Sequence, residues 1–168
     1  MSQPDSPAGG LSLDFQVAER LRAERLTIAT AESSTGGLIA KRLTDLSGSS
    51  AYVIGGVVAY ADAVKQRVLG VREQTLIDCG AVSEPVAQQM ADGARTLFQT
   101  DLALSVTGIA GPTGATATKP VGLTFVGLST PRGTWVRRFV WTGDREHNRR
   151  ASADAAFRLL LDYLDGTL

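Results

Sequence analysis

Hydrophobic and polar positions along the chain follow two alternating patterns, one typical of helices and one typical of strands. Apolar residues at helical spacing predict helices, and these cover residues 11–24, 36–46, 61–69, 72–78, 83–98 and 144–164. Runs of apolar and β-branched residues predict strands between them, and these cover residues 26–31, 52–60, 101–107, 121–129 and 133–141. The short segment Thr-Pro-Arg at 130–132 predicts a hairpin between the last two strands.

The order of these elements predicts an α/β fold with a mixed sheet and helices on both faces. Strands and helices alternate early in the chain, and the hairpin comes late. The 168 residues are enough for one domain with a full core, and no internal repeat divides them. Residues 1–10 have neither the basic nor the apolar region of a signal peptide. We interpret them as a disordered leader before a single domain over residues 11–168.

Several local features refine this prediction. Residues 52–60 form a continuous apolar run, which predicts a strand buried on both faces. The pair Gly55-Gly56 within it predicts a bulge or a close approach of another segment. Asp62 is placed to cap the following helix, and Gly48 is placed to end the helix over residues 36–46.

Charge and composition exclude some classes of function. Lysine plus arginine and aspartate plus glutamate both number 17, so the net charge is zero, which argues against direct nucleic-acid binding. No apolar run is long enough to span a membrane. One cysteine, Cys79, and one histidine, His147, argue against a disulfide and against a Cys- or His-based metal site. We therefore expect a cytoplasmic protein without metal, cofactor or membrane contact.

The turn from the first strand into the next helix is the main candidate for chemistry. Its residues 32–37 read Glu-Ser-Ser-Thr-Gly-Gly, and Ser33 lies at the carboxyl end of the strand. The first N–H groups of a helix are unpaired there, so they could hold an anion or an oxyanion formed during acyl transfer. The alternative is that Ser33, Ser34 and Thr35 only cap the helix, because Ser and Thr are preferred at that position.

A lysine could serve as the base for such a serine. Lys65 follows Tyr60 and the predicted strand by one helical turn, where it could be partly desolvated; the alternative is an ordinary solvated lysine. Lys41 lies about 12 Å further along the helix that starts after Ser33, too far for direct proton transfer. A Ser-His-Asp triad would need His147, which lies in a charged segment predicted at the surface, and the G-x-S-x-G elbow is missing around Ser33.

Two further segments could bind an anion. The loop over residues 108–119 contains Gly108, Gly111 and Lys119, and a glycine-rich backbone beside hydroxyls and a lysine can cradle phosphate. The alternative is a plain flexible connection. Arginines cluster at the start of the last helix, where cations oppose the helix dipole, so they either meet an anion or form a solvated face; they are Arg145, Arg149 and Arg150.

Several ordered motifs resemble the CinA C-terminal domain family, which includes stand-alone nicotinamide-nucleotide amidases. The resemblance extends from about residue 11 to the C-terminus and is carried by AESSTGG (31–37), GGVVAYADAVK (55–65), GAVSEPVA (80–87), TGIAGPTG (107–114), KPVG (119–122) and GDR (143–145). It implies a three-layer α/β/α sandwich. It also implies hydrolysis of nicotinamide mononucleotide to nicotinate mononucleotide and ammonia, with a serine nucleophile, a lysine base and no metal.

The resemblance also implies roles for individual residues. Ser33 becomes the nucleophile and Lys65 the base, with Tyr60 beside them. Our mechanistic hypothesis adds an oxyanion site and a nucleotide site. The backbone N–H groups of Ser34, Thr35 and Gly36 would stabilise the oxyanion, and the remaining substrate-binding residues would be Thr107, Gly108, Gly111, Lys119 and Arg145. The expected partners are a small nucleotide substrate and further copies of the chain in a homo-oligomer.

The chain departs from the family pattern at two positions. The family's Tyr-Ser-Asn is here Tyr60-Ala61-Asp62, and an ionised Asp62 can only accept hydrogen bonds. Ser34 stands where the family often has cysteine. Asp62 leaves open the alternative of a nucleotide-binding module with weak or no catalysis. An interaction protein for DNA uptake or damage response is a third hypothesis, disfavoured by the zero net charge.

Overall fold

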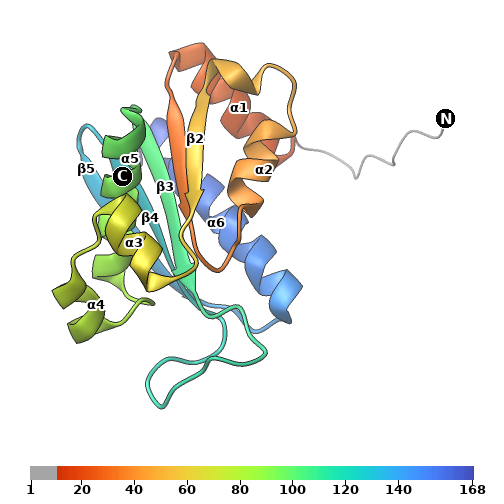
Figure 1. The fold of residues 1–168 in the computed structure, drawn as a ribbon. Helices are drawn as coiled ribbons and strands as arrows, with labels where there is room; N and C mark the ends of the chain where they lie inside the picture. The colour runs from red at the N-terminus through yellow and green to blue at the C-terminus, as the bar shows by residue number, and fades with distance from the viewer. Residues whose placement is uncertain (1–10) are drawn as a thin grey trace.

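The computed structural model describes residues 11–168, and the expected leader over residues 1–10 lies outside the described residues. The elements in chain order are α1 (Leu13–Glu24), β1 (Ile28–Glu32), α2 (Leu38–Thr44), the 3-10 turn η1 (Ser49–Ala51), β2 (Val53–Val58), α3 (Asp62–Leu69), α4 (Glu73–Cys79), α5 (Glu84–Phe98), β3 (Leu102–Gly108), β4 (Leu123–Thr130), β5 (Gly133–Val140) and α6 (Arg145–Leu164) (Figure 1). Each predicted helix and strand is present, with its ends shifted by no more than one or two residues.

The five strands form one mixed sheet in the order β2-β1-β3-β4-β5. Strand β1 is parallel to both β2 and β3, and β4 is antiparallel to both β3 and β5, so the late hairpin is confirmed. Helices α1, α2 and α6 cover one face, and α5 covers the other with α3 and α4 packed against it (Figure 1). The predicted α/β/α sandwich is therefore confirmed. None of the helices in residues 11–168 has the length and hydrophobicity that crossing a lipid bilayer requires.

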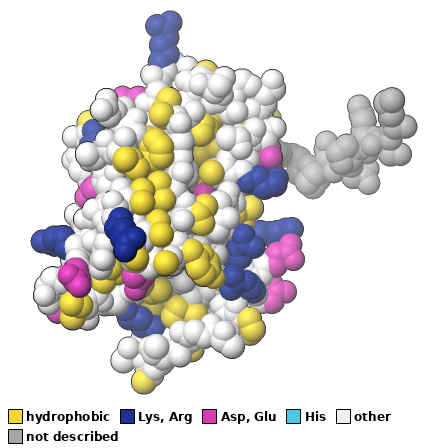
Figure 2. Space-filling view, in the orientation of Figure 1, with side chains coloured by type: hydrophobic (Ala, Val, Ile, Leu, Met, Phe, Trp, Pro, Cys, Tyr) yellow, Lys and Arg dark blue, Asp and Glu magenta, His cyan; other side chains and the backbone are white. Residues whose placement is uncertain are grey.

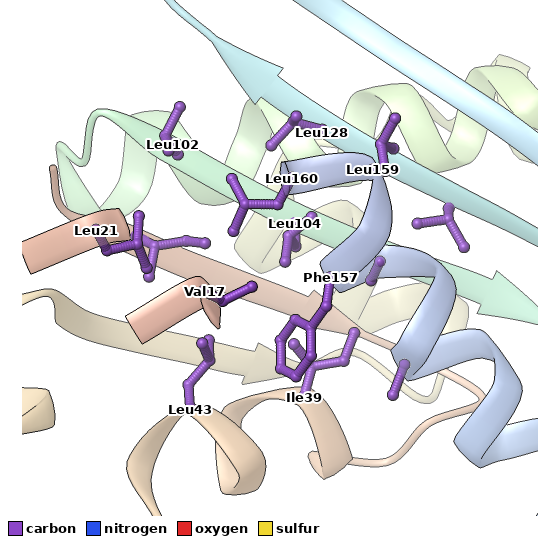
Figure 3. Close-up of a cluster of buried hydrophobic side chains, with 14 of the residues drawn as sticks. Val17, Leu21, Ile39, Leu43, Leu102, Leu104, Leu128, Phe157, Leu159 and Leu160 are labelled. Atoms are coloured by element: carbon purple, nitrogen blue, oxygen red, sulfur yellow. The ribbon is translucent and has the colours of Figure 1, made fainter. Parts of the chain in front are cut away.

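Each face of the sheet carries its own apolar core. On one face, side chains of α1, α2 and α6 pack against β3 and β4 around Phe157, Leu104 and Leu128 (Figure 3). On the other face, Val86 and Met90 of α5 pack against small residues of β1 and β3. These contacts follow from apolar residues recurring every three or four positions along each helix.

Strand β2 is at the edge of the sheet, so the prediction of a strand buried on both faces is wrong. Its side chains alternate between half-buried and exposed, and Ile54 and Val58 are 50% and 52% exposed. An apolar run does not reveal whether a further strand lies beside it. A bulge is present beside the predicted glycine pair, because the register with β1 shifts between Ile28 and Ala29 and leaves Ile54 as the extra residue. The close approach is also present, since a Cβ on Gly56 would lie 2.3 Å from Thr30 Oγ1.

Both predicted caps are wrong. The N-cap of α3 is Ala61, and the carboxylate of Asp62 contacts Lys65 instead of the helix end. Helix α2 ends at Thr44, and Gly48, with φ of 81°, precedes the 3-10 turn. Asp62 pairs with a lysine one turn along its own helix, whereas the segment before Gly48 is held by Arg22 of α1, which donates to the Ser47 carbonyl. Asp144 caps α6, because its carboxylate accepts the backbone N–H of His147 at 2.8 Å.

Asp101 joins the amino ends of β1 and β3. Its Oδ2 accepts the Thr27 backbone N–H at 2.8 Å and the Thr27 hydroxyl at 2.7 Å. The backbone N–H first, and then the hydroxyl, lower the pKa of Asp101 below its usual value. Because the pKa is lower in the folded state, the ionised carboxylate stabilises the fold above about pH 4, and this contribution is lost as the pH falls through the lowered pKa.

Asp101→Asn is therefore expected to lower the free energy of unfolding by about 1–2 kcal/mol at pH 7. The difference from the wild type should shrink between about pH 4 and pH 2. Urea titrations of both proteins at several pH values measure this. A difference that stays constant with pH would show that the charge of Asp101 does not contribute.

Candidate active site

A small pocket lies where the carboxyl ends of β1 and β3 meet the starts of α3 and α6. Its volume is about 200 Å³. The residues that line it are Ser33, Ser34, Tyr60, Asp62, Lys65, Ala81, Val82, Thr107, Gly108, Ala110 and Arg145. Parallel strands end at the same edge of a sheet, which explains how Ser33 after β1 and Thr107 on β3 come together. The pocket thus unites seven of the residues proposed from the sequence: Ser33, Ser34, Tyr60, Lys65, Thr107, Gly108 and Arg145.

The turn that carries Ser33 is held by backbone hydrogen bonds. The Ser33 N–H donates to the Val106 carbonyl at 2.9 Å, and the Gly36 N–H donates to the Ser33 carbonyl at 3.1 Å. The Gly36 amide is therefore occupied within the turn, and of the three amides predicted as oxyanion donors those of Ser34 and Thr35 remain candidates. The hydroxyl of Ser34, in the pocket wall, and that of Thr35, beneath it, are buried without a hydrogen-bond partner among the described residues.

Glu32 supports the turn that carries Ser33, a role that was not predicted from the sequence. The residue is completely buried, and its carboxylate accepts the backbone N–H groups of Gly37 and Ile39 at 3.0 Å each and that of Ala40 at 2.8 Å. The amino end of α2 is thus filled by a carboxylate from the same chain. The expectation that these helical N–H groups are free to bind an anion is wrong. The sequence does contain a signal for this role of Glu32, because a charged residue at the end of a buried strand, just before a helix, needs polar partners.

Glu32→Ala is expected to lower the free energy of unfolding by about 3 kcal/mol, because three N–H groups at the start of α2 lose a charged acceptor. Glu32→Gln should cost less, since its amide oxygen still accepts hydrogen bonds from part of this set. Thermal and urea unfolding of the two variants measure the difference. Equal stability of Glu32→Ala and the wild type would contradict the role of Glu32 in fixing the turn.

Lys65 is buried, with only 1% of its surface exposed, so the alternative of a solvated lysine is wrong. Its Nζ donates to the Tyr60 carbonyl at 3.1 Å and to Asp62 Oδ1 at 3.2 Å. Neither of these hydrogen bonds of the Lys65 ammonium goes to Ser33. Lys41, the rival base, instead forms an exposed ion pair with Asp45.

Arg145 ties the glycine-rich loop to α6. Its Nη1 donates to the Gly111 carbonyl at 3.0 Å, and its Nη2 donates to the Tyr60 hydroxyl at 3.4 Å. Gly111 therefore supports Arg145 without lining the pocket. Arg149 also has a structural contact, because its Nη2 donates to the Thr35 carbonyl at 2.6 Å.

The structure does not bring the other candidates into the pocket. The Lys119 ammonium donates to the Cys79 carbonyl and lies outside the pocket lining. Thr35 and Gly36 lie in the turn behind Ser33 and are likewise not part of the lining. His147 lies in the exposed first turn of α6, as expected, and does not line the pocket.

Comparison with known proteins identifies the family. The sequence profile of the CinA C-terminal domain matches residues 11–164. This chain belongs to the CinA C-terminal domain family. A CinA-like protein of Syntrophus aciditrophicus is 49% identical over 155 residues, which are 91% of this chain and 37% of that protein. A CinA-like protein of Sulfurihydrogenibium sp. is 46% identical over 154 residues, which are 92% of this chain and 38% of that protein.

Solved structures of CinA proteins share the fold. A CinA superfamily protein from Klebsiella pneumoniae superposes with a TM-score of 0.89 at 34% identity, over 92% of this chain and 96% of that chain. The competence/damage inducible protein CihA from Agrobacterium tumefaciens gives a TM-score of 0.85 at 37% identity, over 95% of this chain and 99% of that chain. The chain spans a little over a third of the curated relatives it matches, and nearly all of these solved chains.

Proposed function

We propose that this CinA C-terminal domain hydrolyses the amide of nicotinamide mononucleotide to nicotinate mononucleotide and ammonia. The observation that supports the proposal is the presence of Ser33 and the buried Lys65 in one pocket. A serine with an adjacent amine base is one of the recurring arrangements for acyl transfer. The resemblance to nicotinamide-nucleotide amidases supplies the substrate.

The proposed reaction passes through an acyl-enzyme. Lys65, in its neutral form, accepts the proton of Ser33 as Oγ attacks the amide carbon. The amides of Ser34 and Thr35 stabilise the oxyanion of the tetrahedral intermediate. When the C–N bond breaks, the Lys65 ammonium returns the proton to the leaving nitrogen, and ammonia departs. Water, with Lys65 again as base, then hydrolyses the Ser33 ester to the acid.

Arg145 is the proposed contact for the nucleotide phosphate. Its hydrogen bonds go to a carbonyl and a phenol, so no carboxylate neutralises its charge among them. A guanidinium forms strong hydrogen bonds with phosphate oxygens. The buried hydroxyl of Ser34 can complete its hydrogen bonding with a polar group of the bound molecule.

Asp62 favours a second candidate function, a nucleotide-binding module with weak catalysis. Its carboxylate lies 3.2 Å from Lys65 Nζ, so it occupies the amine that the amidase mechanism needs as a base. Asp62 is also more than half exposed, so water screens this attraction. In this second candidate, the nucleotide binds without being hydrolysed.

Ammonia release from nicotinamide mononucleotide by the purified protein, with calorimetric titration of the same nucleotide, separates these candidates. Release together with binding supports the amidase. Binding without release supports the module, and Asp62→Asn should then restore turnover if Asp62 is the cause. Absence of both binding and release would contradict both functions.

A further inference from the structure

Asp62 and Arg145 give the candidate active site two opposite charges. Besides Lys65, they are the only charged residues among the described residues that line the pocket. Arg145 donates its hydrogen bonds to the Gly111 carbonyl and the Tyr60 hydroxyl, so it is not paired with Asp62. The pocket therefore offers a negative group and a positive group at separate places, which suits a ligand that carries both charges.

Asp62 can contact a ligand without leaving Lys65. Its Oδ1 lies 3.2 Å from Lys65 Nζ, whereas its Oδ2 makes no hydrogen bond to any residue in the range 11–168. The Asp62 side chain is 56% exposed and lines the pocket. Glu32, which precedes Ser33 in the chain, is buried and its carboxylate already accepts three backbone N–H groups. Asp62 therefore supplies the negative charge that a bound molecule meets.

The surface on the β2 side of the pocket adds no competing charge. Residues 52–60 contain no charged side chain, and hydrophobic side chains form a band over β2 down this face of the molecule (Figure 2). Tyr60 ends this segment and lines the pocket with 62% of its surface exposed. An aromatic ring attracts cations through its π-electrons. Asp62 and Tyr60 thus favour a positive charge in the ligand, and Arg145 favours a negative one.

We propose that Asp62 selects the oxidised, cationic nicotinamide ring over the reduced, neutral ring. This inference rests on the proposed function, because it takes nicotinamide mononucleotide as the ligand. The ring carbon that bears the amide is separated from the charged ring nitrogen by a single atom. An amide bound between Ser33 and Lys65 therefore brings the ring charge close to Asp62, which contacts Lys65. Reduction of the ring removes this charge but keeps the amide and the phosphate.

The expected preference is modest, because Asp62 remains in contact with water. An attraction between charges that water screens changes a binding constant by about fivefold. Asparagine, the residue of the family pattern at this position, has no charge, so Asp62→Asn should lose this part of the preference. The selectivity is thus expected of this chain and not of relatives that carry the asparagine.

Calorimetric titration with oxidised and with reduced nicotinamide mononucleotide tests the proposal. All variants carry Ser33→Ala, so that the oxidised nucleotide is not hydrolysed during the titration. Adding Asp62→Asn should lower the ratio of the two binding constants by about fivefold, through weaker binding of the oxidised form. Asp45→Asn is the matched control, since Asp45 also pairs with a lysine, Lys41, but lies outside the pocket. It should leave the ratio unchanged.

A second set of titrations makes the result independent of the charge on Lys65. In a Lys65→Met background, Asp62→Asn should again lower the preference for the oxidised form. An unchanged ratio in both backgrounds, or no binding of either nucleotide, would overturn the proposal. Ammonia release by the wild type tests the proposed function separately. Preferential binding that depends on Asp62, without hydrolysis, would contradict the amidase alone, and hydrolysis without that preference would contradict the role of Asp62 alone.

Discussion

Ser33→Ala is expected to lower kcat for ammonia release from nicotinamide mononucleotide by about 10⁴-fold or more, because it removes the atom that attacks the amide carbon. The side chain lines the pocket and is nearly buried, so its loss should change the fold little. Calorimetry should show that the variant still binds the nucleotide. Steady-state ammonia release by the variant and by the wild type gives the ratio of their kcat values.

Ser34→Ala is the matched comparison for this variant. Its hydroxyl lies in the same pocket wall but is assigned to binding, so we expect an effect mainly on KM and a kcat within about tenfold of the wild type. If Ser33→Ala keeps kcat within tenfold of the wild type, Ser33 is not the nucleophile. A loss of kcat in Ser34→Ala as large as that in Ser33→Ala would contradict the assignment of Ser34 to binding alone.

Lys65→Met is expected to lower kcat by about 10²–10⁴-fold, because it removes the proposed base and acid. Methionine has a similar length and suits a side chain that is 2% exposed, so the variant should remain folded. Asp62 loses its ionic partner, but it is 56% exposed and can be solvated by water. Ammonia release gives the loss of activity, and circular dichroism checks the fold.

Lys41→Met provides the control for charge and composition. Lys41 lies on α2 in an exposed ion pair with Asp45, outside the pocket. The Lys41→Met variant should therefore release ammonia at the same rate as the wild type. Partial rescue of Lys65→Met by small primary amines in solution would support the role of the missing amine. Full activity of Lys65→Met would rule out Lys65 as the base.

The sequence predicted the elements well because their signals are local. The apolar stripe of α5 and its start at Ser83-Glu-Pro85 are contained within one helix. The meeting of Ser33 and Lys65 in one pocket could also be anticipated, because both follow strands at their carboxyl ends. The edge position of β2 could not, since strand order depends on contacts between distant segments.

The contacts of Lys119 and Glu32 could not be predicted, because they too depend on how separate segments meet. Lys119 hydrogen-bonds the carbonyl of Cys79, 40 residues earlier, and nothing in the spacing of residues 108–119 indicates this partner. Glu32 fills the start of α2 only because its strand ends there with the carboxylate turned toward the helix. An amphipathic pattern identifies which face is buried, but it does not tell which polar groups satisfy each other.

Trapping with hydroxylamine tests the central claim, that the amide is cleaved through an ester on Ser33. Hydroxylamine competes with water for an acyl-enzyme, so the wild type incubated with nicotinamide mononucleotide should convert part of its product to the hydroxamate of nicotinate mononucleotide. Ser33→Ala should form none. If the wild type releases ammonia while nicotinate mononucleotide is the only product at high hydroxylamine, or if Ser33→Ala forms as much hydroxamate as the wild type, the account is contradicted.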